Sequence, residues 1–264
     1  MSGDSKGAYP GLSHRNDADL KAWLAKRPRE AALEPALPII DPHHHFWDTP
    51  HRGRYFLPEL LEDIGGGHNI VSTVFLECQA MYRKHGPANM APVGEVEFVN
   101  GISAMSASGG YGPCRVAEAI IGHADLTLGA RAREVLEAEL RVGGGRFRGI
   151  RHGVSWDPND AIQKFATRSV PPHLVRDAKF REGFAQLAPL GLSFESWQYH
   201  RNCRTRSISP ALSPTPRSSS IMSAACSASA PMPATGRRSS PAGRRTSPNW
   251  PDARMSTSSS AASA

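Results

Sequence analysis

Short apolar runs alternate with amphipathic stretches over the first 200 residues, and this alternation limits the fold more than any other feature of the sequence. Each run is bounded by turn residues, as buried strands are. The five runs are residues 37–41, 70–78, 116–123, 147–154 and 192–199. Apolar residues recur at the three-and-four spacing of a helix over residues 92–106, 130–142 and 173–190. Repeated strand–helix order predicts an α/β fold with a parallel sheet and helices on its outer faces.

Glycine placement helps to decide between an open sheet and a closed barrel. No G-x-G-x-x-G follows the first predicted strand, and the glycine triplets at 65–67 and 143–145 precede strands. This placement disfavours a nucleotide-binding sheet and favours a (β/α)8 TIM barrel. A complete barrel needs about 250 residues, whereas five predicted strands take up the first 200 residues here. We therefore expect an incomplete barrel of about five strand–helix units, whose open sheet edges would favour aggregation.

The composition changes abruptly at residue 200. Of the net charge of +7, residues 201–264 contribute +8, from nine Arg and one Asp, and residues 1–200 contribute the remaining −1. This tail consists mainly of Ser, Ala, Arg and Pro and has neither helical nor strand periodicity. One interpretation is a disordered, basic, low-complexity tail.

A second interpretation of the tail is translation in the wrong reading frame. If most free third codon positions are G or C, each codon's last base can be read with the next codon's first two. Residues 221–227 then become His-Val-Gly-Gly-Val-Leu, and residues 253–261 become Pro-Asn-Val-Tyr-Val-Lys-Leu-Gly. Both products are apolar and rich in strand-forming residues, unlike the written tail. The frameshift is a hypothesis that sequencing of the gene tests.

The chain before the first strand resembles a helical extension. Residues 17–32 place Leu20, Trp23 and Leu24 at helical spacing after Asn16, a residue suited to cap a helix. We expect an N-terminal helical extension (1–36), a partial barrel (37–200) and the tail (201–264). No signal peptide and no run of about 20 apolar residues is seen, so we expect a cytoplasmic protein without a membrane partner. The four cysteines form no C-x-x-C motif, and we expect free thiols.

The first strand ends in Asp-Pro-His-His-His-Phe-Trp-Asp at residues 41–48. Alternate side chains of a strand share a face, so His43 and His45 point together and His44 points away. Asp41 shares their face and could orient a ring nitrogen. Imidazole pairs bind zinc and similar ions, and metal-bound water can lose a proton near neutral pH. Barrel active sites lie at this end of the strands, which favours a metal site over a tag or a surface histidine run.

Residues 39–48, Ile-Ile-Asp-Pro-His-His-His-Phe-Trp-Asp, resemble the D-x-H-x-H opening of the amidohydrolase superfamily, in its amidohydrolase-related, lactonase-like branch. Phe-Leu-Glu-Cys at 75–78 and the segments 147–152 and 192–200 are similar to that branch too. The resemblance covers about residues 37–200. It implies a TIM barrel that uses a divalent metal, zinc in the first place, although a member without a metal remains open.

The resemblance also implies roles for particular residues. It implies that the catalytic residues are His43, His45, Glu77, Arg151, His152 and His200. It also implies that the metal ligands are His43, His45 and His200, and that Arg148, Arg151 and Tyr199 bind the substrate. An arginine fork can hold a carboxylate through two parallel hydrogen bonds, which supports Arg151 in this role. A surface ion pair for Arg151, a structural role for Glu77 and a solvated His200 are the alternatives.

The chain departs from the family pattern in two places. The pattern has a His after strand six and an Asp after strand eight, and the written chain contains neither. The His-Val-Gly-Gly of the other frame resembles strand six of this family, which favours the frameshift. Because part of the site is missing, we expect little or no activity from the chain as written.

Three functions follow from these observations. The first is hydrolysis of a small carboxylated lactone or a related cyclic ester or amide by activated water. The second is decarboxylation, which related members of the superfamily carry out and which the fold alone does not separate from hydrolysis. The third is nucleic-acid binding by the basic tail, supported by charge alone, since Trp250 is its one aromatic residue. We expect the first, with a small-molecule partner, no nucleic acid and an oligomeric state left open.

Overall fold

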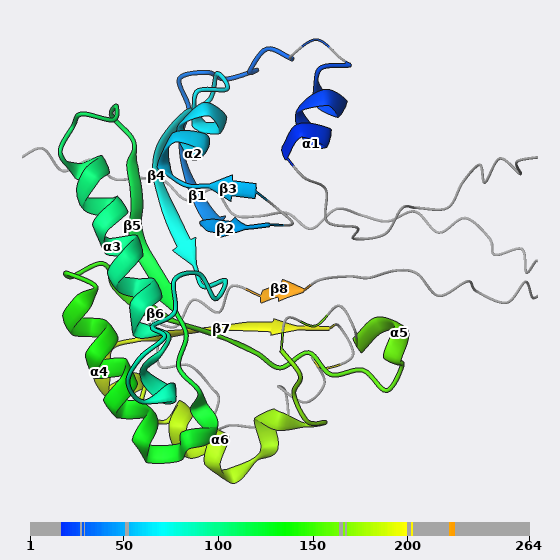
Figure 1. Ribbon diagram of the computed structural model, residues 1–264, viewed down its shortest axis with the longest axis vertical. Helices are drawn as coiled ribbons and strands as arrows, with labels where there is room; N and C mark the ends of the chain where they lie inside the picture. Colours follow the sequence, from blue (N-terminus) through cyan, green and yellow to red (C-terminus); the bar gives the residue numbers. More distant parts are fainter. Residues whose placement is uncertain are drawn as a thin grey trace, which may run out of the picture. The chain divides into compact units, whose positions relative to one another are not determined.

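A computed structural model describes residues 17–26, 28, 30–50, 53–163, 166, 168–199, 202 and 222–224 (Figure 1). Its centre is a parallel sheet in the order β1-β4-β5-β6-β7-β8. The strands are β1 (Pro38–His44), β4 (Asn69–Leu76), β5 (Arg115–Gly122), β6 (Phe147–Gly153), β7 (Ser193–Gln198) and β8 (Met222–Ala224). Each strand pairs in parallel with the next one in this order. The strand direction turns steadily from β4 to β7, so the sheet curls.

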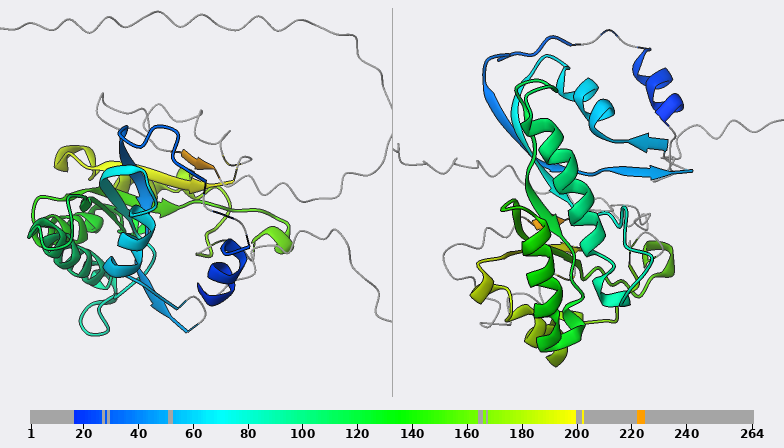
Figure 2. Two further views of the ribbon diagram at one scale, coloured as in Figure 1. Left: turned by 90° about the horizontal axis from the view of Figure 1, so that it is seen from above. Right: turned by 60° about the vertical axis from the view of Figure 1, so that its left-hand side comes forward.

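Helices and one hairpin connect these strands. The α-helices are α1 (Asp17–Leu24), α2 (Leu57–Ile64), α3 (Val93–Ala107), α4 (Ala132–Val142), α5 (Asp160–Gln163) and α6 (Ala178–Phe184). The 3-10 helices are η1 (Ala88–Met90), η2 (Leu126–Arg131), η3 (Leu174–Arg176) and η4 (Ala188–Leu190). The hairpin joins β2 (Trp47–Thr49) and β3 (Gly53–Tyr55). Helices α3 and α4 lie side by side along the sheet (Figure 2), the arrangement of an α/β fold with a partial barrel.

The core lies between the middle strands and the helices. Strands β5 and β6 are buried over most of their length, as expected for parallel strands covered on both faces. Ile120 and Ile150 of these strands and Leu136 of α4 are fully buried. Each such side chain contributes about 1.5–3 kcal/mol through the water excluded on burial. None of the helices in the described ranges combines the length and the apolarity needed to cross a bilayer.

Strand β1 is an edge of the sheet. Within the described residues it pairs with β4 alone, and its burial alternates along the strand. Ile40 is 62% exposed, and Leu37 just before the strand is half exposed. An edge strand with exposed apolar side chains is a template for pairing with another chain, and aggregation stays a prediction.

The five strands predicted from the sequence are all present, as β1, β4, β5, β6 and β7. Two predicted helices are shorter or broken. The helix expected over 17–32 ends at Leu24, four residues before Pro28, which cannot continue a helix. The helix expected over 173–190 is divided into η3, α6 and η4, because the extended Asp177 stops η3 and caps α6 by accepting a hydrogen bond from the Phe180 N–H.

The hairpin, helices α2 and α5 and strand β8 are among the elements that the sequence did not predict. The hairpin β2–β3 and helix α2 fill the segment between the first two strands of the large sheet. Strand β8 lies in the tail and pairs with β7. Backbone pairing along the free edge of β7 requires no particular side chains, so hydrophobic periodicity does not signal it. Apart from Asn202 and β8, the tail lies outside the described residues.

Candidate functional site

The rings of His43 and His45 meet at the end of β1. Their Nε2 atoms are 3.1 Å apart, and the ring planes are nearly perpendicular. His44 points to the other side, where its Nε2 lies 2.8 Å from the Thr73 hydroxyl. The pleat of the strand thus produces the predicted pairing of alternate histidines.

A backbone carbonyl sets the orientation of His45. Its Nδ1 lies 2.7 Å from the Leu76 carbonyl oxygen. Because a carbonyl only accepts, Nδ1 carries the proton and Nε2 presents a lone pair to His43. Asp41, expected to orient a ring, instead accepts a hydrogen bond from the His43 backbone N–H, 3.0 Å away. A short Asp side chain reaches the N–H two residues on more easily than a ring, which explains this correction.

Burial keeps both histidines neutral. Removal from water lowers the pKa of His45 from 6.5 to about 4, with a smaller lowering by Arg151. The pKa of His43 is lowered by burial and by Arg151, although Asp41 raises it. Neutral imidazole is the form that binds a metal or accepts a proton.

A buried carboxylate lies beside the pair. Glu77, directly after β4, is 4% exposed. Its Oε1 accepts a hydrogen bond from Arg151 Nε at 3.1 Å, and its Oε2 accepts one from Arg168 Nη2 at 3.1 Å. Arg151 Nη2 donates to the Glu77 carbonyl. Burial raises the pKa of Glu77, but Arg168 and Arg151 outweigh it and hold that pKa below its usual value. Glu77 is therefore an ionised anchor and a weak base.

Arg151 joins this carboxylate to the histidines. Its Nη1 lies 3.5 Å from His43 Nε2, and its guanidinium carbon is 5.7 Å from the ring centre of Trp197 on β7. Two nitrogens of Arg151, Nε and Nη2, thus bind Glu77, and the third, Nη1, faces the histidine pair. Arg151, Arg168 and Glu77 together carry one positive charge, while the carboxylates of Asp41 and Glu195 act on His43 and Arg151. Arg151 Nη1 is a cationic group that faces the histidine pair.

Sequence reasoning missed three residues of this centre. Tyr82 accepts a hydrogen bond from Arg168 Nη2 at 2.9 Å. His123, directly after β5, has its Nδ1 2.9 Å from the Arg151 carbonyl oxygen and 3.2 Å from Arg168 Nη1. Burial lowers the pKa of His123 to about 4. His123 closes a predicted strand, so its position at the carboxyl end was a usable signal. Arg168 had none, because it lies in a long loop after β6.

His152 faces away from Arg151, its neighbour on β6. Its Nδ1 is 2.9 Å from the Gly153 carbonyl oxygen, and its Nε2 is 3.8 Å from Asp125 Oδ1. The His152 ring centre lies 5.1 Å from that of His123. The contact with His152 holds the pKa of Asp125 well below its usual range. His152 thus borders the centre through His123 rather than through Arg151.

The structure does not bring Arg148 or Tyr199 to the histidine pair. Arg148 is exposed near the start of β6, where it donates to the Gly145 carbonyl and, at 3.2 Å, to the Phe147 carbonyl. Arg148 lies three positions before Arg151 along the strand, and this odd spacing places the two on opposite faces. The Tyr199 hydroxyl donates to the Ile162 carbonyl at 3.1 Å. His200, the predicted third metal ligand, lies outside the described residues.

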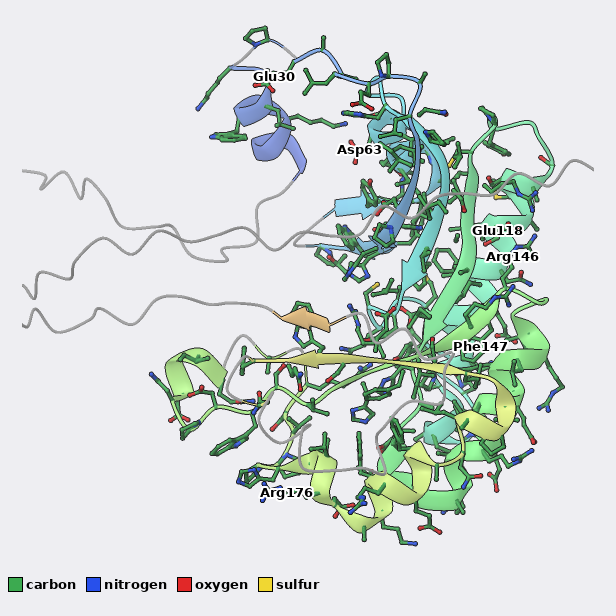
Figure 3. All side chains as sticks on the ribbon, turned by 180° about the vertical axis from the view of Figure 1, so that it is seen from behind. Glu30, Asp63, Glu118, Arg146, Phe147 and Arg176 are labelled. Atoms are coloured by element: carbon green, nitrogen blue, oxygen red, sulfur yellow. The ribbon has the colours of Figure 1, made fainter. Side chains whose placement is uncertain are left out.

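The amino ends of the strands carry structural contacts instead. Arg146, just before β6, has its Nε 3.8 Å from Glu118 Oε2 of β5 (Figure 3). Arg146 also donates to Asn100 of α3 at 2.9 Å. In TIM barrels, catalytic residues lie at the carboxyl ends of the strands, and residues at the amino ends contribute to stability.

The histidine pair fits two ligands of a metal ion. Zinc lies about 2.0–2.1 Å from imidazole nitrogens, so tetrahedral ligands would be about 3.3 Å apart, close to the 3.1 Å between these Nε2 atoms. No group of three or more His, Cys, Asp or Glu side chains in the described ranges is placed to hold a metal. A catalytic zinc takes three protein ligands. The pair would therefore need a third ligand from outside the described residues.

Comparison with known proteins gives three similarities. No protein-family model matches the chain. The uncharacterised protein y4mH of Sinorhizobium fredii is 25% identical over 183 residues, which are 61% of this chain and 54% of that protein. The chain spans about half the length of each protein it matches.

The other two similarities are to crystal structures of an amidohydrolase from Burkholderia multivorans. The structure with bound zinc is 20% identical with a TM-score of 0.43, and the match covers 65% of this chain and 53% of that one. The structure with bound HEPES is 18% identical with a TM-score of 0.38, and covers 65% and 52%.

Proposed function

We propose that the chain is the front part of a hydrolase of the amidohydrolase type, built on the first five units of a (β/α)8 barrel. One observation carries the proposal. Two neutral histidines meet at the carboxyl end of β1, directly beside a carboxylate held by two arginines. Both the position and the residue types suit a hydrolytic centre.

The charge of the centre suggests the substrate class. The Arg151 guanidinium is buried beside the histidine pair, where electrostatic attraction is stronger than in water. A small molecule with a carboxylate would be attracted there and oriented by the outward Nη1 of Arg151. We propose a carboxylated lactone, or a related cyclic ester or amide, because the negative charge that develops on its carbonyl oxygen would be stabilised by the same arginines.

The residues divide the chemistry among them. His43 and His45 would hold a divalent ion, zinc in the first place, which when bound lowers the pKa of a coordinated water. The Leu76 carbonyl keeps the lone pair of His45 Nε2 directed at that position. Arg151 and Arg168 keep Glu77 ionised and in place, so Glu77 orients Arg151 and does not act as the base.

The activity belongs to the whole protein in this proposal. The matched proteins are about twice as long as the aligned region, and the written chain lacks the histidine and the aspartate that the family pattern has after strands six and eight. We propose that these residues are encoded in the other frame beyond residue 200. Sequencing of the gene across the codons for residues 200 and 201 tests this directly: an uninterrupted frame that encodes the written tail would contradict it.

The function is tested with two proteins, the chain as written and the product of a gene whose frame is restored at residue 200. Acid release from a panel of carboxylated lactones is followed in a pH-stat, and carbon dioxide release from aromatic acids is followed in parallel. We expect lactone hydrolysis by the restored protein and little or none by the written chain. Carbon dioxide release without lactone hydrolysis would replace the proposal by a decarboxylase, and fast hydrolysis by the written chain would show that its site is complete.

A further inference from the structure

The loop after β4 has an unusual backbone. Gln79 and Met81 both have positive φ angles, of 69° and 52°, although neither is glycine. Both side chains are exposed, so their own packing does not explain the conformation. Non-glycine residues keep such angles only where the surroundings impose them, and they cluster at functional sites.

A buried carboxylate imposes this conformation. Glu95, in the first turn of α3, is fully buried. Its Oε1 accepts hydrogen bonds from the backbone N–H of Cys78 at 2.9 Å and of Ala80 at 2.8 Å. These two N–H groups flank Gln79. A single oxygen therefore fixes the turn of the chain immediately after Glu77.

The neighbour of Glu95 shows how closely the loop lies on α3. A Cβ at Gly94 would be 2.6 Å from the Met81 carbonyl oxygen and 2.9 Å from the Arg83 nitrogen. The Arg83 N–H also donates to the Ala91 carbonyl at 3.0 Å. Only glycine fits at position 94, so the loop has little freedom to move away from Glu95.

The two ends of this loop reach the candidate site. Glu77 precedes the turn and binds Arg151 and Arg168. Tyr82 follows it and accepts a hydrogen bond from Arg168. We propose that Glu95 is a positioning residue, which fixes the loop through Cys78 and Ala80 so that Glu77 and Tyr82 together hold Arg168. The importance of Arg168 for substrate rests on the proposed function, but the fixing of the loop does not.

The chemistry of Glu95 allows a conservative variant. Burial raises its pKa to about 7, so the group carries a proton for part of the time near neutral pH. Its Oε2 has no hydrogen-bond partner among the described residues. In Glu95→Gln the amide oxygen can still accept both N–H groups, whereas Glu95→Ala removes the acceptor. Gly94→Ala displaces the same loop by a different route.

The test is amide hydrogen exchange on the full chain, which needs no substrate. In Glu95→Ala and Gly94→Ala we expect exchange at Cys78 and Ala80 to rise by more than about tenfold, with less than about threefold change in Glu95→Gln. The Ile120 and Ile121 amides of β5 report global stability and should change little. Glu137→Gln, at an exposed residue of α4 paired with Arg133, is the control.

A second readout follows Tyr82. Burial raises the pKa of its phenol above the ordinary value of 10. Ultraviolet titration of the five tyrosines should show one more phenol ionising in the ordinary range in Glu95→Ala, and not in Glu95→Gln. Unchanged exchange at Cys78 and Ala80 in Glu95→Ala would overturn the proposal. An equal rise in exchange at Ile120 in Glu95→Ala would also overturn it, as would the same rise at Cys78 and Ala80 in Glu95→Gln. Failure to hydrolyse lactones would leave these readouts unchanged and would count only against the proposed function.

Discussion

Arg151 Nε donates to Glu77 Oε1 at 3.1 Å, which joins the end of β6 to the end of β4 across 74 residues of sequence. Both side chains are less than a tenth exposed. The bond uses the protein's own carboxylate to hold the arginine, and it places the remaining Nη1 beside His43. The site is therefore built around an internal ion pair that reaches the histidines.

Removal of Glu77 should strongly destabilise the fold. Glu77→Ala leaves Arg151 and Arg168 without their shared carboxylate, and breaking a buried pair costs about 3–5 kcal/mol. Glu137→Ala, at the exposed pair with Arg133, should cost less than about 1 kcal/mol. Urea denaturation of the two variants measures both values. Equal losses would show that the Glu77 ion pairs contribute no more than a surface pair.

The stability contributed by His45 and His123 should fall as the pH is lowered from 6.5 to about 4. Burial lowers the pKa of His45 and His123 from 6.5 to about 4, so each is neutral in the folded state while the unfolded chain binds a proton. Their contribution is complete above pH 6.5 and is lost as the pH falls toward 4. We expect His45→Asn to flatten the dependence of the unfolding free energy on pH in this window. The exposed His68→Asn is the control, and an equal slope in all three proteins would contradict the burial of His45.

Zinc binding should depend on the histidine pair. His43→Ala and His45→Ala each remove one of two converging nitrogens, so we expect each to weaken zinc binding by more than about tenfold. His44→Ala should have little effect on the zinc affinity, because its ring points to Thr73. Calorimetric titration with zinc alone measures the affinities. Equal affinities of the His43, His44 and His45 variants would place the metal elsewhere.

The exposed edge of β1 should promote self-association of the chain. Ile40 is 62% exposed on this strand, and a charge there should hinder pairing with another chain. We expect Ile40→Lys to lower light scattering and raise the monomer fraction in sedimentation. Leu33→Lys changes a residue that is 97% exposed but lies outside the strands, and it serves as the control. If both substitutions reduce association equally, general hydrophobicity rather than the strand edge drives it.

The strands and the histidine pair were predictable because each depends on a local repeat. Short apolar segments between turn residues mark the strands, as in β5, and the two-residue period of a strand aligns His43 with His45. Arg168 was not predictable. Its bond to Glu77 spans 91 residues and depends on the path of a loop, which hydrophobic periodicity does not encode.

The structure differs from the sequence-based expectation at Asp41 and at Arg148. Asp41 shares a face with His43 and His45 but binds the His43 backbone, because that donor is closer than either ring. Arg148 belongs to a segment that resembles the family, yet its place near the start of β6 keeps it exposed. The sequence does not predict the role of Glu95. That role depends on hydrogen bonds from the Cys78 and Ala80 N–H groups, and only the folded structure shows them.

The most direct test of the account is the rate of lactone hydrolysis by the frame-restored protein and by its His43→Asn/His45→Asn double variant, at equal folded concentration. We expect the restored protein to hydrolyse a carboxylated lactone and the double variant to lose at least about 100-fold in kcat/KM, as when a group that activates water is removed. Hydrolysis by the double variant at the rate of its parent would contradict the assignment of these histidines as the catalytic centre.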